Sequence, residues 1–408
     1  MFTAGSVRWL YDGHAGLGRI AAGLRQGDVH PPLYFWVLEV WRQGVGPSWF
    51  AARLLSVLFT LAGLYGLSRI ARLCRLPAWP VLAMALLSYG FIYTGILARP
   101  FALAQALNIA GVACALRAAH GRRVSWAWLA GAAFGAAAFT DYLAVFTGAA
   151  MLAWLCGRRG WRALPALAAM LPFLAVCFWF FLAQHSARDG QFAPFAWNPA
   201  LLEIMRDGGA ALFGGLPLYA GMALSGAAGG AMAACLALLF LAALACAVRT
   251  RQGRGFLLLA AATPAGLLAL GVAFRNTPIE IRYLAFALPW VALAFAPVLP
   301  RLPLGLWLGA QAAAVAGLIF APATMQPQGR AAHLAAGFPG ALVALPYGND
   351  GVGLPGPFIA AAPDAMRLIL LRPGDDIPPG AVRVAIQADA RSRAVAAAMA
   401  CPTLVCGP

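Results

Sequence analysis

The sequence predicts an all-α polytopic membrane protein with about ten transmembrane helices, further interfacial helices and a small C-terminal domain. The first observation is composition: 62% of the 408 residues are hydrophobic and only 10% are charged, with a mean hydropathy of +0.78. The second is that apolar runs alternate with short clusters of arginine. The third is that this alternation stops near residue 321. Soluble globular proteins have neither this composition nor this pattern.

Residues 1–46 are predicted to form an interfacial region at the outer face of the membrane. Residues 1–30 are mixed and moderately polar, which indicates one or two interfacial helices. The apolar run 32–46 is short, and Glu39 and Arg42 interrupt it. Because the next span runs inward, this run must begin and end outside, so it is predicted to be an interfacial or re-entrant helix.

Further apolar segments follow, and each is expected to cross the membrane. Several are shorter than the about 20 residues that a bilayer requires, so their ends are expected to shift by a few residues. The segments are 50–68, 79–97, 101–116, 125–140, 142–156, 163–183, 228–248, 255–274, 283–299 and 303–321. Together with residues 1–46 they make up a predicted transmembrane domain over 1–321.

The basic residues orient these spans. All 29 of them are arginine, the formal charge is +16, and most lie between apolar runs, which is typical of cytoplasmic membrane loops and not of a nucleic-acid groove. The five loops hold Arg69/Arg72/Arg75, Arg117/Arg122/Arg123, Arg158/Arg159/Arg162, Arg249/Arg251/Arg254 and Arg301. Following the spans in order places all five on one side, which the positive-inside rule makes cytoplasmic. The predicted location is the cytoplasmic membrane of a bacterium, with no nucleic-acid partner.

Residues 322–408 are predicted to form a small extracytoplasmic domain, α/β or mainly β. The segments 341–346, 367–371 and 382–386 have the pattern of short strands between turns. Cys401 and Cys406 lie in this polar tail, separated by four residues, and are predicted to form a disulfide if the tail faces an oxidising compartment. The other cysteines lie in or beside apolar segments and are interpreted as small buried hydrophobic residues.

The stretch from Gly27 to Trp36 is the first candidate for a functional site. Asp28 and His30 stand immediately before Pro31-Pro32, and an aromatic apolar run follows. Proline is tolerated in the first turn of a helix, so a helix is expected to begin there, with His30 just outside it. A polar group beside a helix N-terminus suits an anion such as phosphate. The alternative is an ordinary helix start with solvated flanks.

Other polar residues are predicted to lie at the same face, where charges are costly and often functional. Arg99 lies between two spans; it is either a loop cation at the headgroups or a bidentate phosphate ligand. Asp141 is either part of a short polar turn, a partner for arginine or an acceptor-site carboxylate. Glu280 is interpreted first as an interfacial ion-pair partner, and Arg282 as a second phosphate ligand.

Several classes of function find no support in the motifs. The sequence has no P-loop, GxGxxG, HExxH or nucleophile elbow, so hydrolase and nucleotide-driven functions are not indicated. No metal site is predicted, although a role for a divalent metal stays open, and no cofactor is expected.

These residues resemble a known superfamily, the GT-C membrane glycosyltransferases. The run from Asp28 to Phe35 is similar to the (H/K)PP-L-Y-Y signature of protein O-mannosyltransferases and aminoarabinose-transferase-like enzymes. The resemblance continues through Ser48–Ser56, Ala98–Leu103, Thr140–Leu143 and Arg282–Leu284, and it involves most of residues 1–321. At Asp141 the family more often has histidine. The set in this order is fairly specific to the superfamily but does not indicate the substrate.

The resemblance implies transfer of a sugar from a polyprenyl-phosphate carrier to an acceptor hydroxyl at the outer face. His30, Arg99 and Arg282 would hold the phosphate, and a carboxylate would act as base. The family's acidic pair falls about 25–30 residues before its HPP motif, at or before Met1 here. We therefore expect the true N-terminal helix and acidic motif to be missing from this sequence. Asp28, Asp12 or Asp141 would then have to supply the carboxylate, or the chain is inactive.

Two alternatives from other classes stay open. A transporter with a cavity at the outer face would also place polar groups there, but paired Gly/Pro-broken helices in two matching halves are not evident. A non-catalytic membrane protein derived from a glycosyltransferase is compatible with the missing acidic pair.

Overall fold

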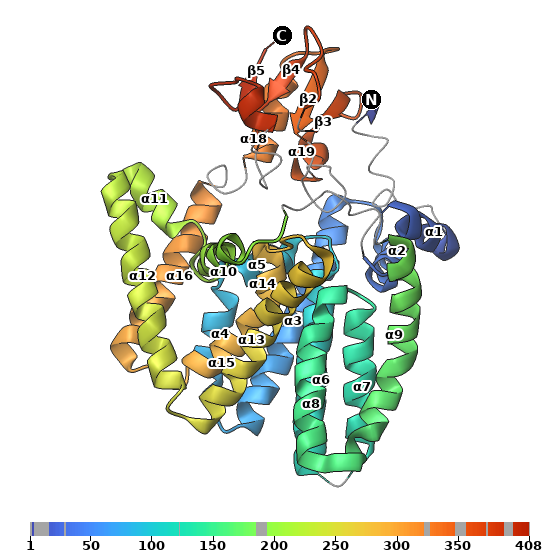
Figure 1. Cartoon of the computed structure of the whole chain (residues 1–408), viewed down its shortest axis with the longest axis vertical. Coiled ribbons are helices and arrows are strands. Elements are labelled where there is room, and N and C mark those ends of the chain that lie inside the picture. Colours follow the sequence, from blue (N-terminus) through green and yellow to red (C-terminus); the bar gives the residue numbers. More distant parts are fainter. Residues whose placement is uncertain are drawn as a thin grey trace.

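The computed structural model describes residues 2–3, 16–27, 30–121, 123–184, 194–321, 327–346, 356–372, 374–386 and 395–407. Asp12 and Asp28 lie outside these ranges, so their predicted roles rest on the sequence. Two parts make up the fold: a large bundle of helices and a small sheet with flanking helices (Figure 1).

The first half of the bundle begins with two short helices, α1 (Leu17–Gly27) and α2 (Leu33–Val45). Longer helices follow, with breaks after α4 and after α7. These are α3 (Trp49–Leu73), α4 (Ala78–Leu86), α5 (Tyr89–Ile96), α6 (Phe101–His120), α7 (Ser125–Ala138), the 3-10 turn η2 (Tyr142–Ala144), α8 (Val145–Arg159), the 3-10 turn η3 (Gly160–Ala163) and α9 (Leu164–Gln184). The helix start predicted after Pro31-Pro32 is confirmed, because α2 begins at Leu33. With 13 residues, α2 is too short to cross a bilayer alone.

The second half contains a short helical hairpin and three further stretches of helix. The elements are α10 (Trp197–Phe213), α11 (Leu216–Ala223), α12 (Gly226–Ala247), α13 (Arg251–Phe274), α14 (Ile281–Leu284), the 3-10 turn η5 (Ala285–Ala287), α15 (Leu288–Phe295) and α16 (Arg301–Phe320). One large apolar core runs through the bundle, with Trp290, Phe295 and Trp307 among its largest fully buried side chains.

The expected count of about ten spans is not confirmed. Each expected segment is helical, but only six stretches of the described residues are long and apolar enough to cross a membrane, or seven if α4 and α5, bent by 68°, count as one. One of the six is the 43-residue stretch Tyr142–Gln184, which includes α8 and α9. The segments 125–140 and 283–299 give shorter helices, because the apolar runs include turns: α7 has 14 residues and α14, η5 and α15 divide the other run.

The arginine-rich connections lie together, as following the spans in order predicts. The α3–α4, α6–α7, α8–α9, α12–α13 and α15–α16 connections are all at the end of the bundle remote from the sheet (Figure 1). The opposite end holds the α5–α6, α7–η2 and α13–α14 connections, which carry Arg99, Asp141 and Glu280.

The packing of α7 against α6 and α9 positions the chain that leads into Asp141. Gly131 of α7 lies so close to α9 that an added Cβ would overlap the carbonyl oxygen of Ala166. Small residues allow such close backbone approach in membrane helix pairs. A further tie joins α2 to the end of α7, since the Leu33 N–H donates to the Phe139 carbonyl at 3.4 Å.

The sheet contains the three strands predicted in the C-terminal tail. Its order is β1-β3-β2-β4-β5, from β1 (Phe2–Thr3), β2 (Leu342–Pro346), β3 (Arg367–Leu371), β4 (Val382–Val384) and β5 (Val405–Cys406). β2 pairs in parallel with β3 and β4, whereas β1 and β5 are antiparallel edge strands. Helices α18 (Gln328–Ala335) and α19 (Gly356–Ala361) pack on the sheet, which makes this part α/β.

The N-terminal strand is a difference from the sequence analysis. Phe2 pairs with Leu368 and Thr3 with Arg367, so these residues belong to the C-terminal sheet and not to an interfacial region at the membrane. At the opposite edge of the sheet, Cys401 and Cys406 form a disulfide beside β5.

Candidate functional site

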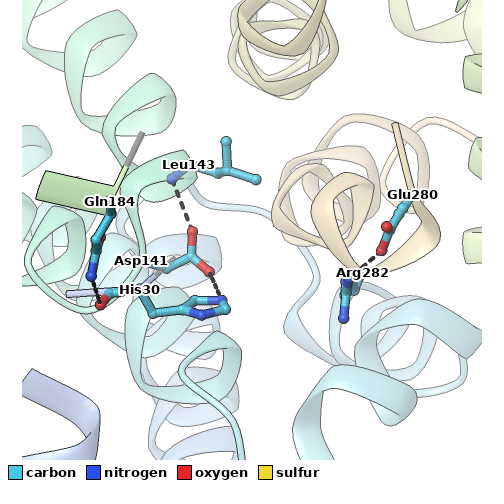
Figure 2. Close-up of polar contacts among 6 residues, drawn as sticks. All are labelled: His30, Asp141, Leu143, Gln184, Glu280 and Arg282. Atoms are coloured by element: carbon cyan, nitrogen blue, oxygen red, sulfur yellow. Dashed lines mark hydrogen bonds and ion pairs between the residues drawn. The ribbon is translucent and has the colours of Figure 1, made fainter. Parts of the chain in front are cut away.

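His30 and Asp141 come from distant parts of the chain and meet in the interior. The His30 Nε2 lies 3.9 Å from the Asp141 Oδ2, and both residues are buried, with 6% and 3% of their surface exposed (Figure 2). The imidazole also contacts the edge of the Phe101 ring, with 6.2 Å between ring centroids. The geometry therefore combines two of the candidate residues in one buried pair.

The local chain fixes how the Asp141 carboxylate points. Asp141 caps η2: its backbone is extended, and its Oδ1 accepts a hydrogen bond from the Leu143 N–H at 2.9 Å. This turn is one of the alternatives given above, but it uses only one oxygen. The other, Oδ2, faces His30 and has no hydrogen-bond partner among the described residues. An ionised carboxylate accepts hydrogen bonds at both oxygens, so Oδ2 has capacity left for a substrate proton.

Gln184 holds both members of this pair, and the sequence analysis did not identify it. Its side-chain N–H groups donate to the carbonyl oxygens of His30, at 3.1 Å, and Leu24, at 2.9 Å. Its Oε1 accepts a hydrogen bond from the Tyr142 hydroxyl at 2.8 Å. In the sequence Gln184 is only a polar residue at the end of an apolar run, and that was the one signal available.

Glu280 and Arg282 form a second pair, as the interpretation of Glu280 as an ion-pair partner predicts. The Arg282 Nε lies 2.5 Å from the Glu280 Oε2, and the guanidinium lies over the Tyr283 ring at 5.1 Å. Arg282 is buried, whereas the Glu280 side chain is 31% exposed. Figure 2 shows this pair apart from His30 and Asp141.

One face of α6 connects the two pairs. The Phe101 ring contacts His30 on one side and lies 6.5 Å from Tyr283 and 6.4 Å from Phe286. Further along α6, Gln105 donates to the Ala285 carbonyl at 3.0 Å and Asn108 to the Ala144 carbonyl at 3.1 Å. These carbonyls lie one turn after Arg282 and Asp141, so buried amides of α6 hold both charged turns.

Arg99 lies in the α5–α6 connection and is partly exposed. It directly precedes Pro100, and α6 begins at Phe101, whose ring contacts His30. Its position at this end of the bundle agrees with the face predicted for it.

A third ion pair at the same end was not identified from the sequence. On α10, the Arg206 Nε donates to the Asp207 Oδ1 at 2.9 Å. This hydrogen bond raises the pKa of Arg206 above its usual value. Asp207 is buried, whereas the Arg206 side chain is 60% exposed, so the arginine faces outward.

The described residues contain no group of three or more His, Cys, Asp and Glu side chains that could hold a metal ion. The chemistry that these residues offer is therefore that of a carboxylate, an imidazole and guanidinium groups.

Comparison with known proteins gives matches among solved structures. No family model and no curated protein sequence matches this chain. The chain is similar to ArnT. Against apo ArnT from Cupriavidus metallidurans it is 17% identical over 90% of this chain and 83% of that chain, with a TM-score of 0.35. Against the ArnT structure bound to undecaprenyl phosphate it is 17% identical over 89% and 84%, with a TM-score of 0.36. ArnT is an aminoarabinose transferase of the GT-C family, the group named by the sequence resemblance.

Proposed function

We propose that this protein transfers a sugar from a polyprenyl-phosphate-linked donor to an acceptor hydroxyl at the outer face of a bacterial cytoplasmic membrane. The observation that carries the proposal is the buried pair of His30 and Asp141, whose free carboxylate oxygen is a suitable proton acceptor. The motifs that contain these two residues and Arg282 are those that resemble the GT-C enzymes.

In the proposed reaction the acceptor oxygen attacks the anomeric carbon of the sugar. The new bond joins that carbon to the acceptor oxygen, and the bond that breaks joins it to the phosphate oxygen. The electron pair of the broken bond leaves with the polyprenyl phosphate. The hydroxyl proton passes to the Asp141 Oδ2, which faces His30 and has no hydrogen-bond partner among the described residues.

Cations would stabilise the leaving phosphate as its charge develops. Arg282 is suited to this role because guanidinium presents planar donors that match phosphate oxygens. Arg99 and His30 are the further proposed phosphate ligands. Donors fixed before the reaction stabilise developing charge without reorganising. Burial of Arg282 over the Tyr283 ring supports such a fixed role.

The side of the membrane follows from charge. The arginine-rich connections lie at the end remote from the site, and such loops stay in the cytoplasm. The site and the α/β sheet at 322–408 would then both be extracytoplasmic. The sheet is proposed to bind the acceptor.

The test is transfer of a radiolabelled sugar from polyprenyl phosphate to membrane acceptors by the purified chain in lipid vesicles. We expect transfer by the wild type and strong loss in His30→Ala, Asp141→Asn and Arg282→Gln. Arg301→Gln, in a connection at the remote end, is the control and is expected to transfer at the wild-type rate. Absence of transfer with every polyprenyl-phosphate sugar tried would contradict the proposal.

A further inference from the structure

Gln184 is the side chain whose contacts the proposed reaction leaves unexplained. It is the last residue of α9 and only 2% of its surface is exposed. A primary amide has two N–H donors and an oxygen acceptor. Gln184 uses both donors and its oxygen, with partners in three separate parts of the chain: the Leu24 carbonyl of α1, the His30 carbonyl and the Tyr142 hydroxyl.

We propose that Gln184 is the positioning residue of the His30–Asp141 pair. The inference rests on the proposed function for its catalytic consequence. The amide binds the backbone of His30 itself and the side chain of Tyr142, the residue directly after Asp141. One rigid group thus sets the separation of the imidazole and the carboxylate from the side of α9.

The chemistry of the three bonds requires an amide. Two carbonyl oxygens need donors, and the tyrosine hydroxyl needs an acceptor. A carboxylate of the same size has no donors, and a thioether of similar length offers neither a donor nor a strong acceptor. Either replacement leaves buried carbonyl groups without their hydrogen bonds, which is costly in a low-dielectric interior.

A second contact indicates that α9 and α1 meet at a defined place. One turn or so before Gln184, the Trp179 ring lies 4.1 Å from the guanidinium carbon of Arg25. This cation–π contact lies at the protein surface and joins the same two helices. Gln184 is the buried end of this junction, so loss of its amide would act on the chain that leads to His30 and not on the whole bundle.

The test compares Gln184→Met and Gln184→Glu with Gln311→Met in the full-length protein in lipid vesicles. Gln311 is a matched control: it is a fully buried glutamine on α16, and it donates to the Leu212 carbonyl at 3.3 Å away from the pair. The two readouts are kcat and KM for sugar transfer, and hydrogen–deuterium exchange of the peptide spanning residues 24–36.

For both Gln184 variants we expect kcat to fall by about 10- to 100-fold with little change in KM, because misplacing reacting groups by a fraction of an ångström is costly. Exchange in the 24–36 peptide should accelerate in both variants and stay unchanged in Gln311→Met. Tyr142→Phe, which removes only one of the three bonds, should fall between them and the wild type.

Wild-type kcat and wild-type exchange in both Gln184 variants would overturn the inference. An equal fall of kcat in Gln311→Met would also overturn it, because any buried glutamine would then have the same effect. If the wild type transfers no sugar while exchange still accelerates only in the Gln184 variants, the proposed function fails and the positioning role stands.

Discussion

The two charged pairs of the candidate site are built in different ways. Glu280 and Arg282 are separated by one residue at the start of the four-residue helix α14, so local chain geometry brings them together. His30 and Asp141 are joined by tertiary structure, through the α7–η2 turn, the start of α2 and the amide of Gln184. The local pair has its carboxylate partly in solvent, whereas both members of the tertiary pair are buried.

This difference shows which pair is sensitive to the packing of the bundle. An ion pair with a solvent-exposed carboxylate contributes little to stability, so Arg282 is free to serve an anionic ligand. A buried pair is stable only where its remaining polar atoms find partners, and here one oxygen of Asp141 is left over. We therefore expect changes in helix packing to affect the His30–Asp141 pair and to leave the Glu280–Arg282 pair in place.

The largest effect is expected at Asp141. Asp141→Asn removes the proposed proton acceptor but keeps the shape of the side chain, so transfer should fall by about 10²- to 10⁴-fold. The initial rate of transfer from a labelled donor measures this fall. Asp375→Asn, in a turn of the C-terminal sheet, is the control and should keep the wild-type rate.

Asp28 is the rival carboxylate at this site. If Asp28→Asn stops transfer while Asp141→Asn retains it, the role of base belongs to Asp28 and the buried pair is structural.

The next effect is expected at the local pair. Arg282→Gln removes a fixed donor from the proposed phosphate site and should slow transfer by about 10²- to 10³-fold. Arg282→Lys keeps the charge but not the planar fork, so it should recover only part of the rate. Full activity of Arg282→Gln would contradict the phosphate role, and Arg206→Gln, in the outward-facing pair on α10, serves as the control.

Gly131→Ala separates the two pairs by packing. The added methyl group would overlap the Ala166 carbonyl oxygen, so α7 and α9 must move apart, at a cost of about 1–3 kcal/mol. These helices lead to Asp141 and end in Gln184, so thermal unfolding in detergent should begin at a lower temperature and transfer should slow. Gly157→Ala has open space around the new Cβ and should have neither effect. Equal stability of the two variants would show that the close approach of α7 and α9 does not matter.

The smallest effects are expected from the two amides of α6. Asn108→Leu and Gln105→Leu each leave one buried carbonyl without its donor, at a cost of about 1–3 kcal/mol. Asn108 supports the turn of Asp141 and Gln105 that of Arg282. Asn108→Leu should therefore add little in an Asp141→Asn background, and Gln105→Leu little in an Arg282→Gln background. Transfer rates of the double variants measure this, and full additivity in both would contradict separate support of the two pairs.

The sequence predicted what depends on neighbouring residues. Proline at the helix start placed His30 just before α2, and the short alternating runs in the tail gave β2, β3 and β4. The Glu280–Arg282 contact was also foreseeable, since the residues are almost adjacent. The lengths of the membrane helices were less accurate, because apolar runs do not mark bends such as the one between α4 and α5.

Contacts between distant segments could not be predicted from one sequence. The positive-inside rule placed His30 and Asp141 at one face but gave no distance between them. Gln184 carries no motif, and its role depends on the meeting of three segments. The two residues of β1 are too few for an alternating pattern, so nothing in the sequence assigned them to a sheet at the other end of the chain.

The most direct test of the central claim is a double-mutant cycle on His30 and Asp141, with the initial rate of sugar transfer as the readout. If the buried pair acts as one unit, His30→Ala should slow the wild type strongly but should hardly slow Asp141→Asn further. Independent, multiplicative losses in the double variant, or wild-type rates in both single variants, would contradict the claim that this pair carries the reaction.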